Sequence, residues 1–383
     1  MLESSVVSVT PEVILFREVS AANGRRIGYA QLNAGKSLNA LSLPMIRLLD
    51  PQLQRWAADP GIACVVLHGA GEKAFCAGGD VRSMHQAIVD HRGAPPNLEN
   101  LAFFSEEYRL DHRIHTYPKP VLVWGSGIVM GGGLGLMAGA SHRVVTGTSR
   151  VAMPEITIGL FPDVGGSYFL NRMPRAFGLF LALTGASING HDLLVTRLAD
   201  HFVDTADRNE IFEQLATVAW TGDTAADRAA LTVLLQGFSE RAADRLPASN
   251  LLSHQALIEQ LTASDSPATV YANLINYSGD DVWIGRAVKV LAEGSPTTAA
   301  LVWELQKRAK GLSLAEVFRL ELIVSLQCCA HPDLREGIRA LLIDKDKQPR
   351  WTPSRYADLS PEWIAEHFVA PPWPEGRHPL ADL

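Results

Sequence analysis

Two glycine-rich loops stand ahead of a pair of carboxylates in the first half of the chain. The loops read Ala-Phe-Cys-Ala-Gly-Gly-Asp at 74–80 and Met-Gly-Gly-Gly at 130–133, and each precedes a segment with a helical pattern. The start of a helix leaves backbone N–H groups without partners, and two such loops can aim these donors at one oxygen. This arrangement would hold the negative oxygen of a thioester enolate or of a tetrahedral intermediate. Either loop taken alone is explained as well by a tight turn.

The two carboxylates are Glu155 and Asp163, in Met-Pro-Glu-Ile-Thr-Ile-Gly-Leu-Phe-Pro-Asp. Pro154 and Pro162 interrupt any helix here, so a loop must bring the two side chains together. Two carboxyl groups in a water-poor cleft push each other's pKa values apart, which can leave one ionised and the other protonated. A lone glutamate after proline is more often a first-turn helix acid. Combined with the glycine loops, the pair predicts proton transfer or nucleophilic attack.

Composition limits the classes of partner. The chain has 383 residues, of which 47% are hydrophobic and 20% charged, as expected for a globular protein with a substantial core. A net charge of −7 argues against a general nucleic-acid or anionic-membrane surface. No stretch approaches 18 apolar residues and the N-terminus lacks a signal-peptide pattern, so we expect a cytoplasmic protein without a membrane partner.

Motifs for other kinds of chemistry are missing. The four cysteines form no CxxC pair and have no suitably spaced histidines, which predicts reduced, buried thiols and no structural metal. The glycine triplet lacks the Gly-x-Gly-x-x-Gly spacing of a dinucleotide site. A Gly-x-Ser-x-Gly motif for a serine nucleophile is also absent.

Residues 1–205 alternate short apolar runs with helical segments. From about Arg208 long amphipathic helices dominate, and the segment 313–329 opens with Ser313 and Glu316 at capping-box spacing. The sequence therefore predicts an α/β core at 1–205 that carries the site, followed by a mainly α-helical region at 206–383. The strands expected in the core are 13–16, 26–31, 64–68, 120–124, 142–146 and 150–152, and the helices are 42–57, 81–90, 101–114 and 134–139.

These segments resemble the crotonase (enoyl-CoA hydratase/isomerase) superfamily, most closely its 3-hydroxyisobutyryl-CoA hydrolase family. The resemblance is carried by 73–80, 127–135, 152–170 and 337–346, and Phe-Phe-Ser-Glu-Glu-Tyr at 103–108 adds to the hydrolase pattern. It implies an α/β fold in which ββα repeats form a spiral that acts on CoA thioesters, with a C-terminal α-helical region.

The resemblance implies roles for particular residues. The N–H groups of Gly79 and Gly132 would form an oxyanion hole, and Glu155 would attack the thioester or activate water. Asp163 would bind the substrate hydroxyl or shuttle a proton. Gly135 stands where hydratases carry a second catalytic glutamate, which argues against hydration by two glutamates. Isomerases can work with the carboxylate at position 155 alone, so that activity is harder to exclude.

The expected substrate-binding residues are less distinctive. Glu107 matches a position that contacts substrate, although a solvated helix face explains it almost as well. Backbone carbonyls around Ala77 would bind the adenine of CoA. Lys73 and Arg82 flank the first loop and could pair with phosphates, or could equally be solvated surface charges.

The sequence thus predicts an acyl-CoA thioester hydrolase whose substrate is 3-hydroxyisobutyryl-CoA from valine breakdown. It would use no metal and no cofactor, because CoA is part of the substrate. Enoyl-CoA hydratase or isomerase activity is the alternative, and a non-catalytic CoA-binding protein is a remote one. Crotonases often form trimers or hexamers, but the helical tail could alter the packing, so homo-oligomerisation is left open.

Overall fold

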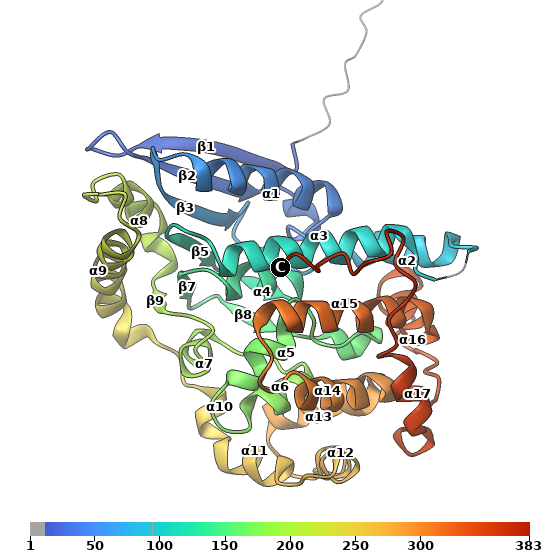
Figure 1. Cartoon of the computed structure of the whole chain (residues 1–383). Coiled ribbons are helices and arrows are strands. Elements are labelled where there is room, and N and C mark those ends of the chain that lie inside the picture. Colours follow the sequence, from blue (N-terminus) through green and yellow to red (C-terminus); the bar gives the residue numbers. More distant parts are fainter. Residues whose placement is uncertain (1–11, 94) are drawn as a thin grey trace, which may run out of the picture.

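A six-stranded sheet runs through the first half of the chain in the order β1-β2-β3-β5-β7-β9 (Figure 1). The computed structural model describes residues 12–93 and 95–383. β1 pairs with β2 in antiparallel fashion, and all later pairs are parallel. The strands are β1 (Ile14–Ser20), β2 (Arg26–Leu32), β3 (Ile62–Gly69), β5 (Val121–Gly125), β7 (His142–Thr146) and β9 (His201–Val203).

A second, three-stranded parallel sheet lies beside it in the order β4-β6-β8. Its strands are β4 (Ala74–Cys76), β6 (Ile128–Met130) and β8 (Arg150–Ala152). Each of these short strands follows one strand of the larger sheet along the chain. The resulting repeat of strand–strand–helix units confirms the expected spiral. Because parallel strands end at the same edge, the segments that follow β4, β6 and β8 meet there. Those segments are the two glycine loops and the loop that begins with Met153.

Helix α3 (Leu98–His115) crosses the middle of the molecule and lies beside α15 (Leu314–Ala330) (Figure 1). The Asn97 side chain caps the start of α3 by accepting from two backbone N–H groups. The predicted capping box of Ser313 and Glu316 is present at the start of α15. The packing of α15 against α3 means that α3 is covered on more faces than a surface helix would be.

After β9 the described residues contain helices and no further strand. The hydrophobic core nevertheless continues across the expected boundary near residue 205, because α16 packs against α2 as α15 does against α3. α16 (Pro332–Ile338) continues into a π-helical turn at Arg339–Ile343. The other helices are α1 (Leu43–Ala58), α2 (Val81–Asp90), α4 (Gly132–Ala138), α5 (Gly166–Phe169), α6 (Phe177–Thr184), α7 (Gly190–Val195), α8 (Arg208–Leu215), α9 (Thr224–Ala242), α10 (Asn250–Ser253), α11 (Gln255–Thr262), α12 (Pro267–Ile275), α13 (Val282–Glu293), α14 (Pro296–Arg308) and α17 (Pro361–Glu366).

Gly237 offers a test of the helical region. It lies on the exposed side of α9, and a Cβ added there would meet no heavy atom within 4 Å. Glycine in a helix interior is less favourable than alanine, so Gly237→Ala should raise the free energy of unfolding by about 0.5–1 kcal/mol in urea denaturation. The matched control is Gly222→Ala, which should lose stability because Gly222 has φ +83° and its Cβ would meet the Arg25 guanidinium. A destabilised Gly237→Ala would contradict the placement of α9.

Candidate active site

A cavity of about 300 Å³ opens where the two glycine loops, the loop after β8 and helix α3 meet. All expected site residues line it except Lys73 and Arg82. The turn after α16 contributes Leu341 and Leu342, so the C-terminal helical region also forms part of the wall. The full lining comprises Ala77, Gly78, Gly79, Val81, Met84, Phe103, Phe104, Glu107, Met130, Gly131, Gly132, Pro154, Glu155, Thr157, Ile158, Leu160, Asp163, Val164, Leu341 and Leu342.

Two backbone N–H groups are available at this cavity. Among the described residues, neither the Gly79 N–H nor the Gly132 N–H has a hydrogen-bond acceptor. The two loops approach closely, since a Cβ built on Gly132 would lie 3.4 Å from the Gly79 nitrogen. Gly131, between β6 and α4, has φ +48° and allows the sharp turn that exposes these groups. Two unpaired donors side by side can stabilise one developing oxyanion.

Glu155 lies against the second glycine loop. It is the first residue of a 3-10 turn at Glu155–Ile158 and is only 6% exposed. A Cβ built on Gly131 would lie 2.9 Å from Glu155 Oε1, and Glu155 Oε2 has no hydrogen-bond partner among the described residues. Burial, and then the nearby Asp163, raise the pKa of Glu155 well above its ordinary value.

Asp163 shares the cavity and has a different environment. It is 5% exposed, and the Tyr108 hydroxyl donates to its Oδ2 at 2.7 Å. Ser325 Oγ lies 2.7 Å from the same hydroxyl. Burial raises the pKa of Asp163 to about 6, while the Tyr108 hydrogen bond acts in the opposite direction. Asp163 is therefore the carboxyl in this cavity whose ionised form is supported by a hydrogen bond.

The loop that carries Asp163 is held from α15. Val164 and Gly165 both have positive φ, +52° and +84°, which is unfavourable for a β-branched residue such as valine. The fully buried Glu321 carboxyl accepts from the N–H groups of Gly165 at 2.7 Å and Ser167 at 2.8 Å. Burial raises the pKa of Glu321 to about 8. Glu321 thus fixes the strained backbone beside Asp163.

Glu107 extends from α3 into the cavity and is 2% exposed. The alternative of a solvated helix face is wrong for Glu107, because its carboxyl is buried against Gly132 at the start of α4. The interpretation as a solvated helix face is correct for the neighbouring residue Glu106, which forms an exposed ion pair with Arg47 at 2.7 Å. Burial and then Asp163 raise the pKa of Glu107 well above its ordinary value.

The structure does not bring Lys73 or Arg82 to the cavity. Both side chains are exposed and neither forms an ion pair among the described residues. Contact with CoA phosphates therefore stays a prediction for both. The four cysteines are free and buried, as expected. Within residues 12–93 and 95–383, no cluster of His, Cys, Asp or Glu could hold a metal ion, and no helix could cross a membrane.

Sequence reasoning missed three polar residues that support the site: Tyr108, Glu321 and Ser325. Tyr108 lies inside the 103–108 motif but was not assigned a role. Glu321 and Ser325 are one turn apart on the apolar helix α15, and both are fully buried. Two polar side chains on one buried face were the available signal, but a sequence pattern alone cannot say what they contact.

A family model described as enoyl-CoA hydratase/isomerase matches residues 27–368. The chain belongs to this family. One curated relative is the mitochondrial 3-hydroxyisobutyryl-CoA hydrolase of Danio rerio, which is 38% identical to this chain over 356 residues. The match covers 93% of this chain and 89% of the relative. The Homo sapiens protein of the same name is 36% identical over 341 residues, 89% of this chain and 86% of the relative. These relatives are named as mitochondrial, so the expected cytoplasmic location stays a prediction.

Solved structures of this family confirm the fold. An enoyl-CoA hydratase from Rhodobacter sphaeroides 2.4.1 has a TM-score of 0.79 and 34% identity, covering 94% of this chain and 97% of that one. A carnitinyl-CoA dehydratase from Mycobacterium thermoresistibile has a TM-score of 0.82 and 34% identity, covering 96% and 99%. The names of these two structures denote hydratase or dehydratase chemistry, whereas the curated relatives are named as hydrolases. The geometry of the site is therefore the evidence that can decide between these activities.

Proposed function

We propose that this family member is an acyl-CoA thioester hydrolase that converts 3-hydroxyisobutyryl-CoA and water into 3-hydroxyisobutyrate and CoA, a step of valine degradation. The proposal is supported by relatives of that name at 36% and 38% identity over about nine-tenths of the chain. One observation carries it: Asp163 shares a cavity with Glu155 and with the N–H groups of Gly79 and Gly132. We further propose that neither a metal nor a cofactor takes part.

In the proposed reaction the thioester oxygen accepts hydrogen bonds from Gly79 and Gly132. These donors stabilise the negative charge that develops on that oxygen, and losing one such donor costs about 10²–10³ in rate. The Glu155 carboxylate attacks the carbonyl carbon, or removes a proton from the water that does so. The C–S bond then breaks, and the CoA sulfur takes up a proton. On the route in which Glu155 attacks, water next hydrolyses the anhydride formed between Glu155 and the acyl group, which releases the acid and restores the carboxylate.

Asp163 connects substrate recognition to the charge on Glu155. In the unliganded cavity, burial and then the neighbouring Asp163 raise the pKa of Glu155 well above its ordinary value, which favours the protonated carboxyl. A substrate hydroxyl that donates to Asp163 offsets part of the negative charge there. This weakens the part of the pKa increase of Glu155 that Asp163 causes, so binding of the hydroxyl favours the Glu155 carboxylate.

This coupling predicts a specificity test. A hydrogen bond from the 3-hydroxyl to a charged carboxylate is worth about 1.5–3 kcal/mol, so isobutyryl-CoA should lose roughly 10–100-fold in kcat/KM against 3-hydroxyisobutyryl-CoA. Asp163→Ala should remove most of that preference, as measured by free-thiol release from both thioesters. If the variant discriminates as strongly as the wild type, Asp163 does not bind the hydroxyl.

Tyr108 should set the pH range of activity. Asp163 loses its proton as the pH rises through about 6, so kcat/KM should rise over the same range. Because the Tyr108 hydroxyl lowers the pKa of Asp163, Tyr108→Phe should raise that pKa and move the increase in kcat/KM to higher pH. The measurement is the pH profile of kcat/KM for both proteins. A rise at an unchanged pH would assign the profile to another group.

Hydration of an enoyl-CoA is the second candidate, favoured by the names of the two solved structures at 34% identity. The geometry at Gly135 argues against it. A Cβ built there would lie 2.7 Å from both Val164 Cβ and Asp111 Oδ2, so this chain has no room for a glutamate at the position where hydratases carry their second one. A non-catalytic CoA-binding role is disfavoured because both carboxylates are present in the cavity.

The proposed partners are limited to the acyl-CoA substrate. The net charge of −7 disfavours nucleic acid and anionic membranes. We keep a cytoplasmic location and phosphate contacts by Lys73 and Arg82 as parts of this proposal, and leave homo-oligomerisation open.

A further inference from the structure

Three polar residues stand one helical turn apart on the same face of α3. They are Glu107, Asp111 and His115, and each has a buried side-chain atom with no hydrogen-bond partner among the described residues. Asp111 is 0% exposed, and both of its carboxyl oxygens lack a partner. Side chains four residues apart on a helix are neighbours, about 5–6 Å apart at Cβ. The three groups therefore form a continuous polar row inside the protein.

The helix that faces this row has glycine at each point of contact. A Cβ on Gly132 would overlap Glu107 Oε1, and a Cβ on Gly135 would lie 2.7 Å from Asp111 Oδ2. Gly139, which caps the end of α4, would place a Cβ 2.5 Å from His115 Cδ2. Real Cβ atoms do not approach other atoms this closely, so each of these α3 side chains occupies space that a side chain on α4 would otherwise fill.

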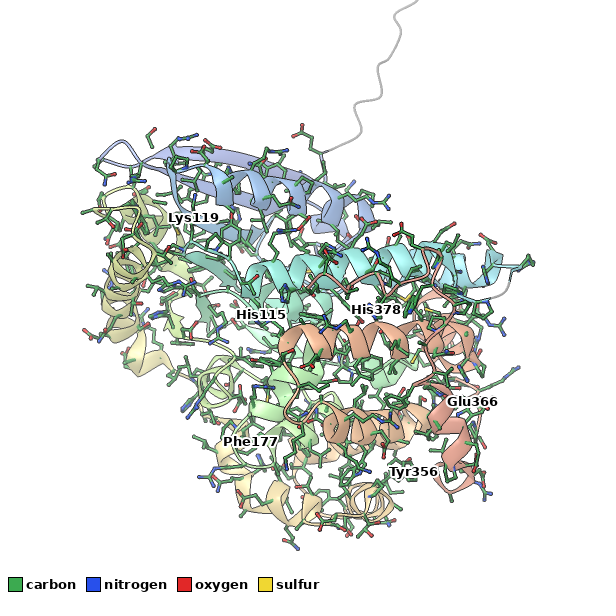
Figure 2. All side chains as sticks on the ribbon, in the orientation of Figure 1. His115, Lys119, Phe177, Tyr356, Glu366 and His378 are labelled. Atoms are coloured by element: carbon green, nitrogen blue, oxygen red, sulfur yellow. The ribbon has the colours of Figure 1, made fainter. Side chains whose placement is uncertain are left out.

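The row runs from the cavity to the end of α3. Glu107 lines the cavity at one end, and His115 is the last residue of the helix (Figure 2), where its side chain is partly exposed while its Nε2 is buried. Asp111 lies between them and does not reach the cavity. Buried polar groups without protein partners are generally satisfied by ordered water, and one water can bridge groups at the spacing of a helical turn. Both carboxyl groups and the imidazole can pass a proton in either direction.

The surrounding groups favour neutral forms along the row. Burial raises the pKa of Asp111 well above its ordinary value, and the nearby carboxyls of Glu107, Asp163 and Glu321 act in the same direction. Burial lowers the pKa of His115 to about 4, and His112 and Arg143 add to that effect. Burial thus favours the protonated form of both carboxyls and the neutral form of the imidazole, which allows a proton to pass without a fixed charge remaining inside.

We propose that Glu107, Asp111 and His115 form a proton path along α3 that carries the proton released by thioester hydrolysis from the cavity to the surface. This inference rests on the proposed function. Each turnover consumes one water, whose oxygen forms the new C–O bond of the product acid. One proton of that water goes to sulfur as the C–S bond breaks. The second proton is released when the product acid ionises. Glu107 takes up that proton while passing its own to Asp111. Asp111 passes one to His115 and His115 to solvent, so every group returns to its starting state.

The first test separates proton transfer from structural support. Asp111→Asn keeps the shape of the side chain but removes its transferable proton, so kcat should fall about 10-fold or more while KM is retained. His115→Ala should show the same loss, and imidazole in the buffer should restore much of it because His115 is at the outer end of the row. The matched control is Glu106→Gln on the exposed face of the same helix, which should keep wild-type kcat.

The second test does not depend on turnover. The infrared bands of protonated carboxyl groups shift when protein is moved into D₂O, and their rate of shift reports proton exchange with solvent. We expect the bands that remain in Asp111→Asn, and those of His115→Ala, to shift about 10-fold more slowly than in wild type. Unchanged exchange in both variants would overturn the path, even if kcat had fallen. If the wild-type protein cleaves no thioester, the proposed function fails. Slower exchange of carboxyl protons in the two variants would still support the proton path in that case. If Asp111→Asn does not fold, His115→Ala alone decides.

Discussion

Glu155→Gln is expected to lower kcat for thioester cleavage by at least about 100-fold, the scale of acid–base or nucleophilic catalysis. The substitution preserves the size of the side chain but removes its ability to attack or to take up a proton. Because Glu155 Oε2 has no hydrogen-bond partner among the described residues, the amide breaks no contact of that oxygen, and the fold should persist. Free-thiol release and a thermal melt on the same preparation give both results.

A control for this variant is Glu366→Gln, because Glu366 is exposed on α17 and does not line the cavity. It should retain wild-type turnover. Near-full turnover by Glu155→Gln would mean that another group performs the chemistry, and the assignment of Glu155 would have to be withdrawn.

Gly132→Val should abolish most activity while changing the melting temperature much less. A Cβ at Gly132 would already displace the Glu107 carboxyl and would lie 3.4 Å from the Gly79 nitrogen. The branched side chain would then occupy the space in which the thioester oxygen meets the two donors. We expect a loss of about 10²–10³ in kcat/KM, the cost of one missing oxyanion donor.

The matched control is Gly285→Val on α13, where a Cβ would meet nothing within 4 Å. It should keep full activity. Should Gly132→Val unfold, Gly132→Ala adds only the Cβ and becomes the deciding variant, because Gly132 has ordinary backbone geometry. A folded Gly132→Ala enzyme with unimpaired kcat/KM would argue that Gly132 serves only the turn.

The sequence was most informative where short strands lead directly into the site. β4, β6 and β8 are each three residues long, and the parallel pairing of neighbouring strands places the two glycine loops and Glu155 at one edge. The glycine-rich motifs indicated that the two loops meet, and the family resemblance identified Gly79, Gly132 and Glu155 as the residues that do so. The expected ββα spiral follows from the same alternation of strands and helices.

The groups that tune the site were not predictable in this way. The Tyr108 hydroxyl contacts Asp163 across 55 positions and Ser325 across 217. Nothing in the pattern of α3 shows that α4 covers the face that carries Glu107, so Glu107 looked as exposed as Glu106. Burial of these groups depends on tertiary packing of the helical region, which residue spacing within one helix does not encode.

The most direct measurement gives one preparation of the protein 3-hydroxyisobutyryl-CoA and crotonyl-CoA in parallel, following free thiol in the first reaction and enoyl absorbance in the second. We predict steady thiol release at about 1 s⁻¹ or faster, within the usual range of enzyme turnover, and only trace hydration of crotonyl-CoA. Hydration at about 10 s⁻¹ or more without thiol release would contradict the account. It would show that Glu155 suffices for hydration despite the missing side chain at Gly135.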